Sequence, residues 1–225
     1  MGISAQYIGR KVAGIKGDSF RLAALALLAA LAGPGATARA ADFDYYLLAL
    51  SWSPSWCAAA RGPAPEQCAP DRDLGFTLHG LWPQYDDGGW PEDCATEARD
   101  PSRRMTQGMA DIMGSPGLAW YQWKKHGRCA GLEAGDYFGR ARRAYRAFAL
   151  PGLAERPQTA AAIEQAFRSA HPELAPDDLI VTCAEGRIQE VRICLTPALA
   201  PRPCAADVLA DACRGTRPLE VPPAP

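Results

Sequence analysis

The stretch at residues 43–52, FDYYLLALSW, indicates the class of fold. A short run this rich in aromatic and aliphatic residues is typical of a buried strand. A second short strand is predicted at Leu74–His79, and both segments lead into loops that contain Pro, Gly and Asp. We therefore expect two strands of one sheet in the first part of the chain.

Helical patterns occupy the middle of the chain. Asp100 followed by Pro101 predicts a helix start, with a capping aspartate before a proline at the first helical position. Met105, Met109 and Ile112 then fall on one face, which we expect to pack in the core rather than to form a binding surface. Further helices are predicted at residues 117–126, 136–149 and 159–170.

Strands return after these helices, at Leu179–Cys183 and Arg187–Leu195. Glu185-Gly186 between them is a hairpin signal. Strands on both sides of a helical middle predict an α+β domain.

The first forty residues are typical of a secretory signal peptide. Basic residues precede an apolar run at residues 22–33, and the small-residue pattern at 38–40 resembles a cleavage site. A membrane anchor is the weaker alternative, because a spanning helix needs roughly 20 apolar residues. We expect a secreted or periplasmic monomer, with no membrane anchor after removal of residues 1–40. Its single domain spans 41–216, and the proline-rich segment 217–225 forms an unstructured tail.

Removal of the signal peptide changes the charge of the protein. It takes away five of the 24 Lys and Arg residues and one of the 25 Asp and Glu residues, which leaves about five net negative charges. This charge argues against a protein that coats nucleic acid through a broad basic face, because such binding relies on many phosphate contacts. Any recognition of RNA must be local.

An even number of cysteines follows the signal peptide, which predicts a disulfide framework. The eight are Cys57, Cys68, Cys94, Cys129, Cys183, Cys194, Cys204 and Cys213. A zinc site is disfavoured, because no two of them have the close spacing of structural zinc ligands and the chain has three histidines. We expect no metal and no cofactor.

The three histidines differ in their surroundings. His171 lies at a predicted helix end, where a surface or capping role is the natural interpretation. His126 lies in WYQWKKHGRC, residues 120–129. If this segment is helical, Gln122, Lys125 and His126 share one face, with Tyr121 four residues before Lys125. Taken alone, the segment fits a solvated polar face with a chance histidine equally well.

His79 lies in FTLHGLWP, residues 76–83, and Trp90-Pro91 and Cys94 follow. FTLHGLWP resembles the first active-site segment of the ribonuclease T2 family, and WKKHGRC is similar to the second. FDYYLLALSWSPSWC resembles the amino-terminal strand of the family, and the last four cysteines match its spacing. The resemblance covers roughly residues 43–213.

The resemblance implies a central antiparallel sheet packed against helices, and a secreted endoribonuclease. Such an enzyme cleaves single-stranded RNA to products with a 2′,3′-cyclic phosphate. His126 would be the general base and His79 the general acid, with Lys125 stabilising the charged transition state.

For RNA binding, the resemblance assigns base stacking to Trp82 and Trp90 and base selection to Gln84. Core packing of the two tryptophans is the alternative. The chain departs from the usual family pattern at Tyr121 and Gln122, where most members have histidine and glutamate. Both side chains still donate hydrogen bonds, so they remain candidates for phosphate binding.

The resemblance also implies four disulfides, which pair Cys94 with Cys129, Cys183 with Cys213, Cys194 with Cys204 and Cys57 with Cys68. The first would tie the two active-site segments together. Two other functions remain open: an inactive relative that binds RNA or a host partner, and a disulfide-rich binding module with no role in RNA chemistry.

Overall fold

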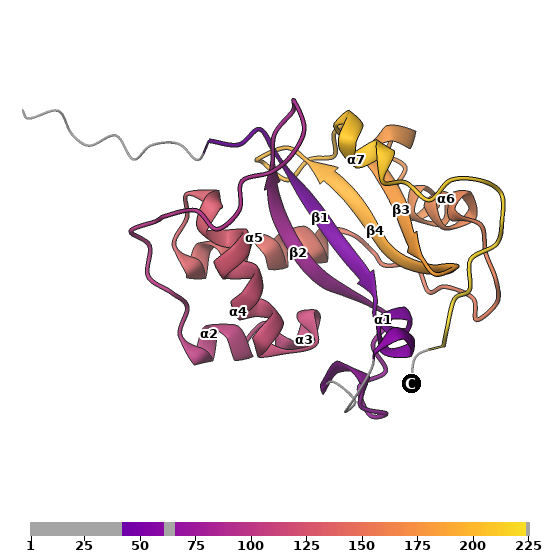
Figure 1. Cartoon of the computed structure of the whole chain (residues 1–225), viewed down its shortest axis with the longest axis horizontal. Coiled ribbons are helices and arrows are strands. Elements are labelled where there is room, and N and C mark those ends of the chain that lie inside the picture. The colour runs from indigo at the N-terminus through magenta and orange to yellow at the C-terminus, as the bar shows by residue number, and fades with distance from the viewer. Residues whose placement is uncertain (1–41, 61–65, 224–225) are drawn as a thin grey trace, which may run out of the picture. The chain divides into compact units, whose positions relative to one another are not determined.

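A computed structural model describes residues 42–60 and 66–223 (Figure 1). These residues belong to one compact unit, 39–225. The predicted signal peptide, residues 1–40, lies outside the described residues. Across the two described ranges, no helix has the length and apolar character needed to cross a membrane.

Four antiparallel strands form a sheet with the order β2-β1-β4-β3 (Figure 1). Their bounds are Tyr45–Trp52 for β1, Phe76–Gln84 for β2, Leu179–Ala184 for β3 and Arg187–Leu195 for β4. The α+β class is therefore confirmed. The second strand continues five residues beyond its predicted end at His79.

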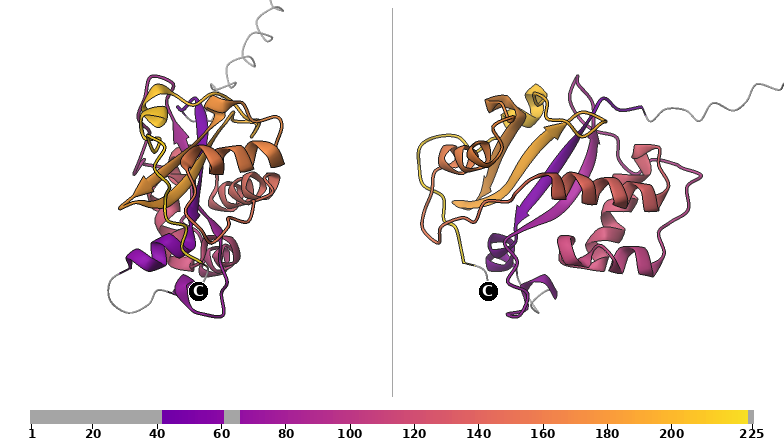
Figure 2. Two further views of the ribbon diagram at one scale, coloured as in Figure 1. Left: turned by 90° about the vertical axis from the view of Figure 1, so that its right-hand side faces the viewer. Right: turned by 180° about the vertical axis from the view of Figure 1, so that it is seen from behind.

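Helices occupy the middle of the chain, as predicted. Helices α5 and α6 lie behind the sheet in Figure 1 and in front of the sheet in the right-hand view of Figure 2. The α-helices are α1 Ser53–Ala59, α2 Arg103–Gln107, α3 Ala110–Met113, α4 Pro116–Lys125, α5 Ala134–Ala147, α6 Ala160–Ala170 and α7 Ala206–Ala210. Short 3-10 helices are η1 Glu66–Cys68, η2 Gly127–Ala130 and η3 Pro176–Asp178. Helix α1 was missed in the sequence because it follows β1 without an intervening loop.

The strand β1 is buried on both faces, as its apolar run predicts. Its even-numbered side chains, such as Leu48 and Leu50, belong to the main core together with apolar residues of α3 to α6. Tyr45 and Leu47 point to the opposite face and belong to a smaller cluster with Val208 of α7. The sheet therefore separates a helix-covered face from a face that is only partly covered.

The helix predicted to begin at Asp100-Pro101 begins later and is broken in two. Ser102 caps α2, and its hydroxyl accepts a hydrogen bond from the Met105 N–H at 3.3 Å. Asp100 instead accepts hydrogen bonds from side chains of α4. The prediction of a core stripe is wrong for Met105, which is 44% exposed, and correct for Met109 and Ile112. The break between α2 and α3 rotates Met105 away from the core.

The described part of the tail, residues 217–223, does not match the prediction of an unstructured end. Leu219 and Val221 are buried, and the Gln158 N–H donates to the Leu219 carbonyl at 3.0 Å. The indole N–H of Trp52 also donates to the Pro222 carbonyl. Two apolar side chains between the prolines are enough to dock this segment on the main core.

His171 lies at the end of α6, as predicted, but it is buried rather than on the surface. Its Nε2 lies 3.1 Å from the Ala149 carbonyl oxygen, and its Nδ1 lies 3.3 Å from a Glu173 oxygen. This histidine therefore has a structural role.

All four expected disulfides are present: Cys57–Cys68, Cys94–Cys129, Cys183–Cys213 and Cys194–Cys204. The described residues contain no free cysteine. The Cys94–Cys129 bond joins the loop after β2 to the segment after α4.

Candidate active site

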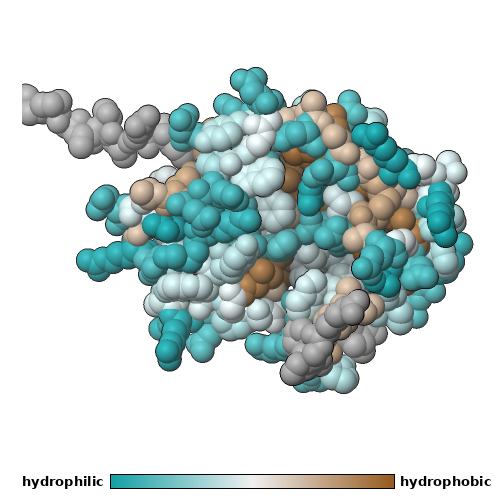
Figure 3. Space-filling model, in the orientation of Figure 1, coloured by the Kyte–Doolittle hydropathy of each residue, from teal (hydrophilic) through white to brown (hydrophobic). Residues whose placement is uncertain are grey.

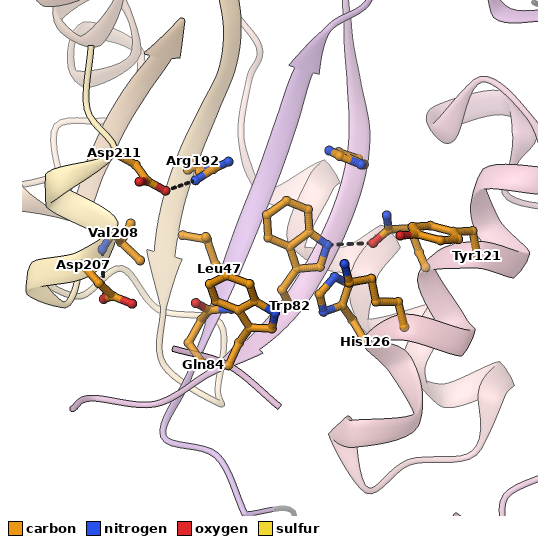
Figure 4. Close-up of a pocket in the computed structure, with 13 residues that line it drawn as sticks. Leu47, Trp82, Gln84, Tyr121, His126, Arg192, Asp207, Val208 and Asp211 are labelled. Atoms are coloured by element: carbon orange, nitrogen blue, oxygen red, sulfur yellow. Dashed lines mark hydrogen bonds and ion pairs between the residues drawn. The ribbon is translucent and has the colours of Figure 1, made fainter. Parts of the chain in front are cut away.

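The two histidine motifs meet at one cavity of about 380 Å³, drawn in Figure 4. Every residue that the sequence predicted for catalysis or RNA binding lines it: His79, Trp82, Gln84, Trp90, Tyr121, Gln122, Lys125 and His126. The rest of the lining comes from β1, β4 and the α7 region: Leu47, Arg192, Asp207, Val208 and Asp211. The cavity therefore lies on the face of the sheet opposite the main core.

A β-bulge in β2 turns His79 and Trp82 to the same face. The pairing between β1 and β2 shifts by one residue at this point, which leaves His79 as the extra residue of β2. In an uninterrupted strand, residues 79 and 82 would point to opposite faces, because side chains alternate. The bulge shifts the alternation by one residue. Leu78 and Leu81 thus both enter the main core, while His79 and Trp82 both line the cavity.

His79 is held by a buried carboxylate that the sequence analysis did not identify. Its Nδ1 lies 2.5 Å from Oε1 of Glu190 on β4, and Glu190 is 2% exposed. Burial tends to raise the pKa of this carboxyl, but the hydrogen bond and charge of His79, together with Arg192, lower the pKa to about 2. Glu190 is therefore ionised, and Nε2 is the nitrogen of His79 that remains for a substrate.

His126 has a different environment. It follows the last residue of α4, and its backbone N–H donates to the Gln122 carbonyl at 2.9 Å. His126 is buried, with 5% of the residue exposed. Burial and the nearby charges of Lys125 and His79 lower the pKa of His126 to about 4, and Glu92 opposes them only in part. At neutral pH the His126 imidazole is therefore uncharged and able to accept a proton.

Lys125 carries a positive charge at the edge of the cavity. Its Nζ lies 3.3 Å from a Glu92 oxygen, which also accepts the indole N–H of Trp90 at 3.0 Å. The hydrogen bond to Glu92 raises the pKa of Lys125. The hydrogen bonds from Trp90 and Lys125 lower the pKa of Glu92. Among the residues that line this cavity, Lys125 supplies the ammonium group.

The indole of Trp82 lies between the two histidines. Its ring centroid is 5.1 Å from that of His79, in an edge contact, and 5.2 Å from that of His126, in a stacked contact. Its Nε1–H donates to Oε1 of Gln122 at 2.7 Å, which is the dashed line at the Trp82 indole in Figure 4. Gly80 leaves room for this bond, because a Cβ there would lie 2.1 Å from the indole nitrogen.

The residues predicted to bind bases differ in exposure. Trp90 is 50% exposed and Tyr121 is 53% exposed, so core packing is excluded for Trp90. Figure 3 shows a mainly hydrophilic face on which apolar side chains form small separate areas. Trp82 is partly buried against the smaller core cluster. Gln84 is buried, and its amide donates to the Pro83 carbonyl at 2.8 Å.

Covalent and backbone links hold the two motifs together. The Cys94–Cys129 disulfide spans them, and the Asp93 N–H donates to the Lys125 carbonyl at 2.8 Å. Asp207 accepts the Gly89 N–H at 2.7 Å, which ties the loop before Trp90 to α7. These contacts therefore hold together the segments around the cavity, which lie far apart in the sequence.

The contribution of β4 to the cavity was not predicted from the sequence. Glu190 and Arg192 are charged residues two positions apart in an apolar strand, so they share one face. Arg192 also contacts Asp211, at 2.8 Å, near the end of α7. Two charges on one face of a predicted buried strand were the signal that could have revealed them.

Known proteins resemble this chain in sequence and fold. "Ribonuclease" of Aeromonas hydrophila is 48% identical over 103 residues, which cover 45% of each chain. "Ribonuclease 3" of Arabidopsis thaliana is 33% identical over 113 residues, which cover 44% of this chain and 50% of the relative. The chain thus spans about half the length of these curated relatives.

Among solved structures, the RNase-related protein from Calystegia sepium has the same fold, with a TM-score of 0.65 at 22% identity. The match covers 81% of this chain and 98% of that one. The model of the ribonuclease T2 family matches residues 43–204. Because this match includes both histidine motifs and most of the sequence, the chain belongs to the ribonuclease T2 family.

Proposed function

We propose that this protein is an endoribonuclease that cleaves single-stranded RNA, with His126 as general base and His79 as general acid. The observation that carries the proposal is the pair of unlike imidazoles on either side of Trp82. His126 is buried and uncharged at neutral pH, whereas His79 has an ionised carboxylate at its Nδ1. Two titratable groups in contrasting environments suit opposite roles in proton transfer.

The reaction is a transphosphorylation. His126 takes the proton of the ribose 2′-hydroxyl, and the oxygen bonds to phosphorus as the bond from phosphorus to the 5′-oxygen breaks. His79 gives its Nε2 proton to that departing oxygen. The products are a 2′,3′-cyclic phosphate and a 5′-hydroxyl end, and no redox change occurs. The cyclic phosphate can be opened slowly by water to a 3′-phosphate.

Three further residues would contact the phosphate. Lys125 would stabilise the negative charge that develops on the phosphorane oxygens. The amide of Gln122 and the hydroxyl of Tyr121 would donate hydrogen bonds to the same oxygens. The Oε1 of Gln122 accepts from Trp82, so its NH2 group is the part that would serve the phosphate.

Stacking would hold the bases of RNA. Trp82 and Trp90 both line the cavity, and stacking on an aromatic side chain contributes roughly 1–3 kcal/mol per base. This mode of binding suits a protein without a broad basic face. Gln84 would contact the edge of a base and select among bases.

We also propose that the protein acts outside the cytoplasm, in the periplasm or the medium, as a monomer. Four disulfides support this location, because such bonds persist in oxidising compartments. The predicted signal peptide would direct the chain there and then be removed.

The test of the proposed function is an assay of the purified mature protein on RNA and on single-stranded DNA, with and without EDTA. We expect RNA to be cut at the same rate in excess EDTA, because the proposed proton transfers need no metal. DNA should stay intact, because it lacks the attacking 2′-hydroxyl.

Two outcomes would contradict this proposal. Loss of cleavage in EDTA that zinc or magnesium restores would point to a metal-dependent enzyme. RNA binding without cleavage would instead favour an inactive member of the family that binds RNA.

The pH dependence of cleavage tests the environment of His126. Because burial lowers its pKa to about 4, His126 is half protonated near pH 4 and uncharged at neutral pH, and the acidic limb of the kcat/KM profile should lie near pH 4. Gln122→Glu would add a negative charge to the same cavity and raise the pKa of His126. We therefore expect the acidic limb to move to higher pH.

A pH series on one dinucleotide substrate for both proteins measures this shift. The variant should keep measurable cleavage at neutral pH, since a carboxylate can still accept the Trp82 indole N–H. An acidic limb that stays in place or moves to lower pH would show that residue 122 does not influence the charge of His126.

A further inference from the structure

Glu190 stands out as a buried carboxylate that the proposed proton transfers do not use directly. It lies on β4, opposite Ser51 of β1 in the register of the sheet. It is 2% exposed and belongs to neither histidine motif. A buried charge is costly unless donors surround it, so its presence needs a reason.

Three donors converge on this carboxylate. Oε1 lies 2.5 Å from Nδ1 of His79 and accepts the Ser51 hydroxyl at 3.2 Å, while Oε2 accepts the Nε–H of Arg192 at 2.8 Å. Arg192 is held in turn by Asp211. Glu190 is therefore fixed in place independently of His79, and the orientation of its two oxygens is set by Arg192 and Ser51.

We propose that Glu190 is the positioning residue for the general acid: it accepts the Nδ1–H of His79 and so directs Nε2, with its proton, to the departing 5′-oxygen. This inference rests on the proposed function. When His79 gives up its Nε2 proton, the uncharged ring retains its proton on Nδ1, where Glu190 already accepts it. No rotation or second proton movement is needed during the step.

The substitution Glu190→Gln should reverse the direction of the hydrogen bond at Nδ1 of His79. The Nε–H of Arg192 still requires an acceptor, so the new amide oxygen turns toward Arg192 and the NH2 group faces Nδ1 of His79. An NH2 group can only donate there, so it favours the uncharged ring with its proton on Nε2. The imidazolium that the acid step needs would lose its acceptor. His79 would keep its place but lose its function as an acid.

The experiment compares two substrates that carry the same base: an RNA dinucleotide and a nucleoside 3′-(4-nitrophenyl phosphate). The alkoxide that leaves the dinucleotide must be protonated, whereas 4-nitrophenolate leaves without a general acid. We expect Glu190→Gln to lower kcat on the dinucleotide about 100-fold and on the nitrophenyl ester less than about fivefold. His79→Ala should give the same pattern, and His126→Ala should lose activity on both substrates.

A control separates this effect from the general cost of neutralising a shielded carboxylate. Glu164→Gln serves, because Glu164 is half-buried on α6 and accepts the Val181 N–H away from the cavity. It should leave kcat on both substrates unchanged. Glu190→Asp keeps the negative charge and should recover part of the dinucleotide activity. Equal losses on the two substrates for Glu190→Gln would overturn the proposal.

A second measurement does not depend on activity. Nitrogen-15 NMR of the wild-type histidine side chains, at a pH where His79 is uncharged, should show its proton on Nδ1, and Glu190→Gln should move the proton to Nε2. A wild-type ring protonated on Nε2 would overturn the role of Glu190 even if the variant fails to fold. Failure of the proposed function is distinguishable, because wild-type protein would then leave RNA intact whatever the NMR result.

Discussion

His79→Phe and His126→Phe should each lower kcat for RNA cleavage roughly 10³- to 10⁴-fold, because phenylalanine cannot transfer a proton at the reacting oxygens. Both variants should remain folded. At position 126 the ring keeps its stacked contact with Trp82, and the buried Nδ1, which lacks a hydrogen-bond partner among the described residues, is removed. At position 79 the carboxylate of Glu190 keeps its bonds from Ser51 and Arg192.

The measurement is steady-state cleavage of a dinucleotide, together with circular dichroism to verify folding. The third histidine provides the control, because His171 lies at the end of α6 and does not line the cavity. His171→Asn should preserve kcat per folded molecule even if it lowers the melting temperature. Near wild-type activity in either phenylalanine variant would refute the mechanism with two histidines.

Lys125→Met should lower kcat about 100-fold, because it removes the positive charge that would stabilise the phosphorane while keeping most of the aliphatic side chain. The adjacent lysine is a matched control. Lys124 does not line the cavity, and its Nζ lies 3.0 Å from Asp100 and near the ring of Trp120. Lys124→Met should change kcat less than about threefold, as expected for an exposed ion pair.

Both lysine variants should be measured for kcat and KM on the same substrate. A transition-state role lowers kcat, whereas a role confined to binding raises KM and leaves kcat unchanged. Equal effects of the two substitutions would show that general charge attracts RNA and that Lys125 has no special position.

Most of the fold could be predicted because its signals are local. The apolar run of β1 and the Glu185-Gly186 turn of the last hairpin both correspond to the structure. The prediction ended β2 too early because Gly80 and Pro83 normally interrupt strands. β2 is an edge strand, and an edge tolerates a proline that a central strand does not.

Most residues of the candidate site could also be identified from the sequence. Helical spacing brought Gln122, Lys125 and His126 toward one face, and all three line the cavity. The prediction failed for Met105, whose exposure depends on a break between α2 and α3, and for the tail, which docks through Leu219 and Val221. The first failure comes from a local break in the helix, and the second from packing partners that lie far away in the sequence.

The sequence by itself determined the α+β class and the disulfide framework, because residue type and short-range spacing carry that information, and the resemblance of its two histidine motifs to the ribonuclease T2 family identified His79 and His126. The tertiary structure decided how the histidines differ. The bulge at His79 turns it to the same face as Trp82. Strand β4, which lies more than 100 residues later in the chain, places Oε1 of Glu190 2.5 Å from Nδ1 of His79. Burial lowers the pKa of His126 to about 4. Strand register and burial arise from long-range pairing, and no local pattern around either histidine encodes them.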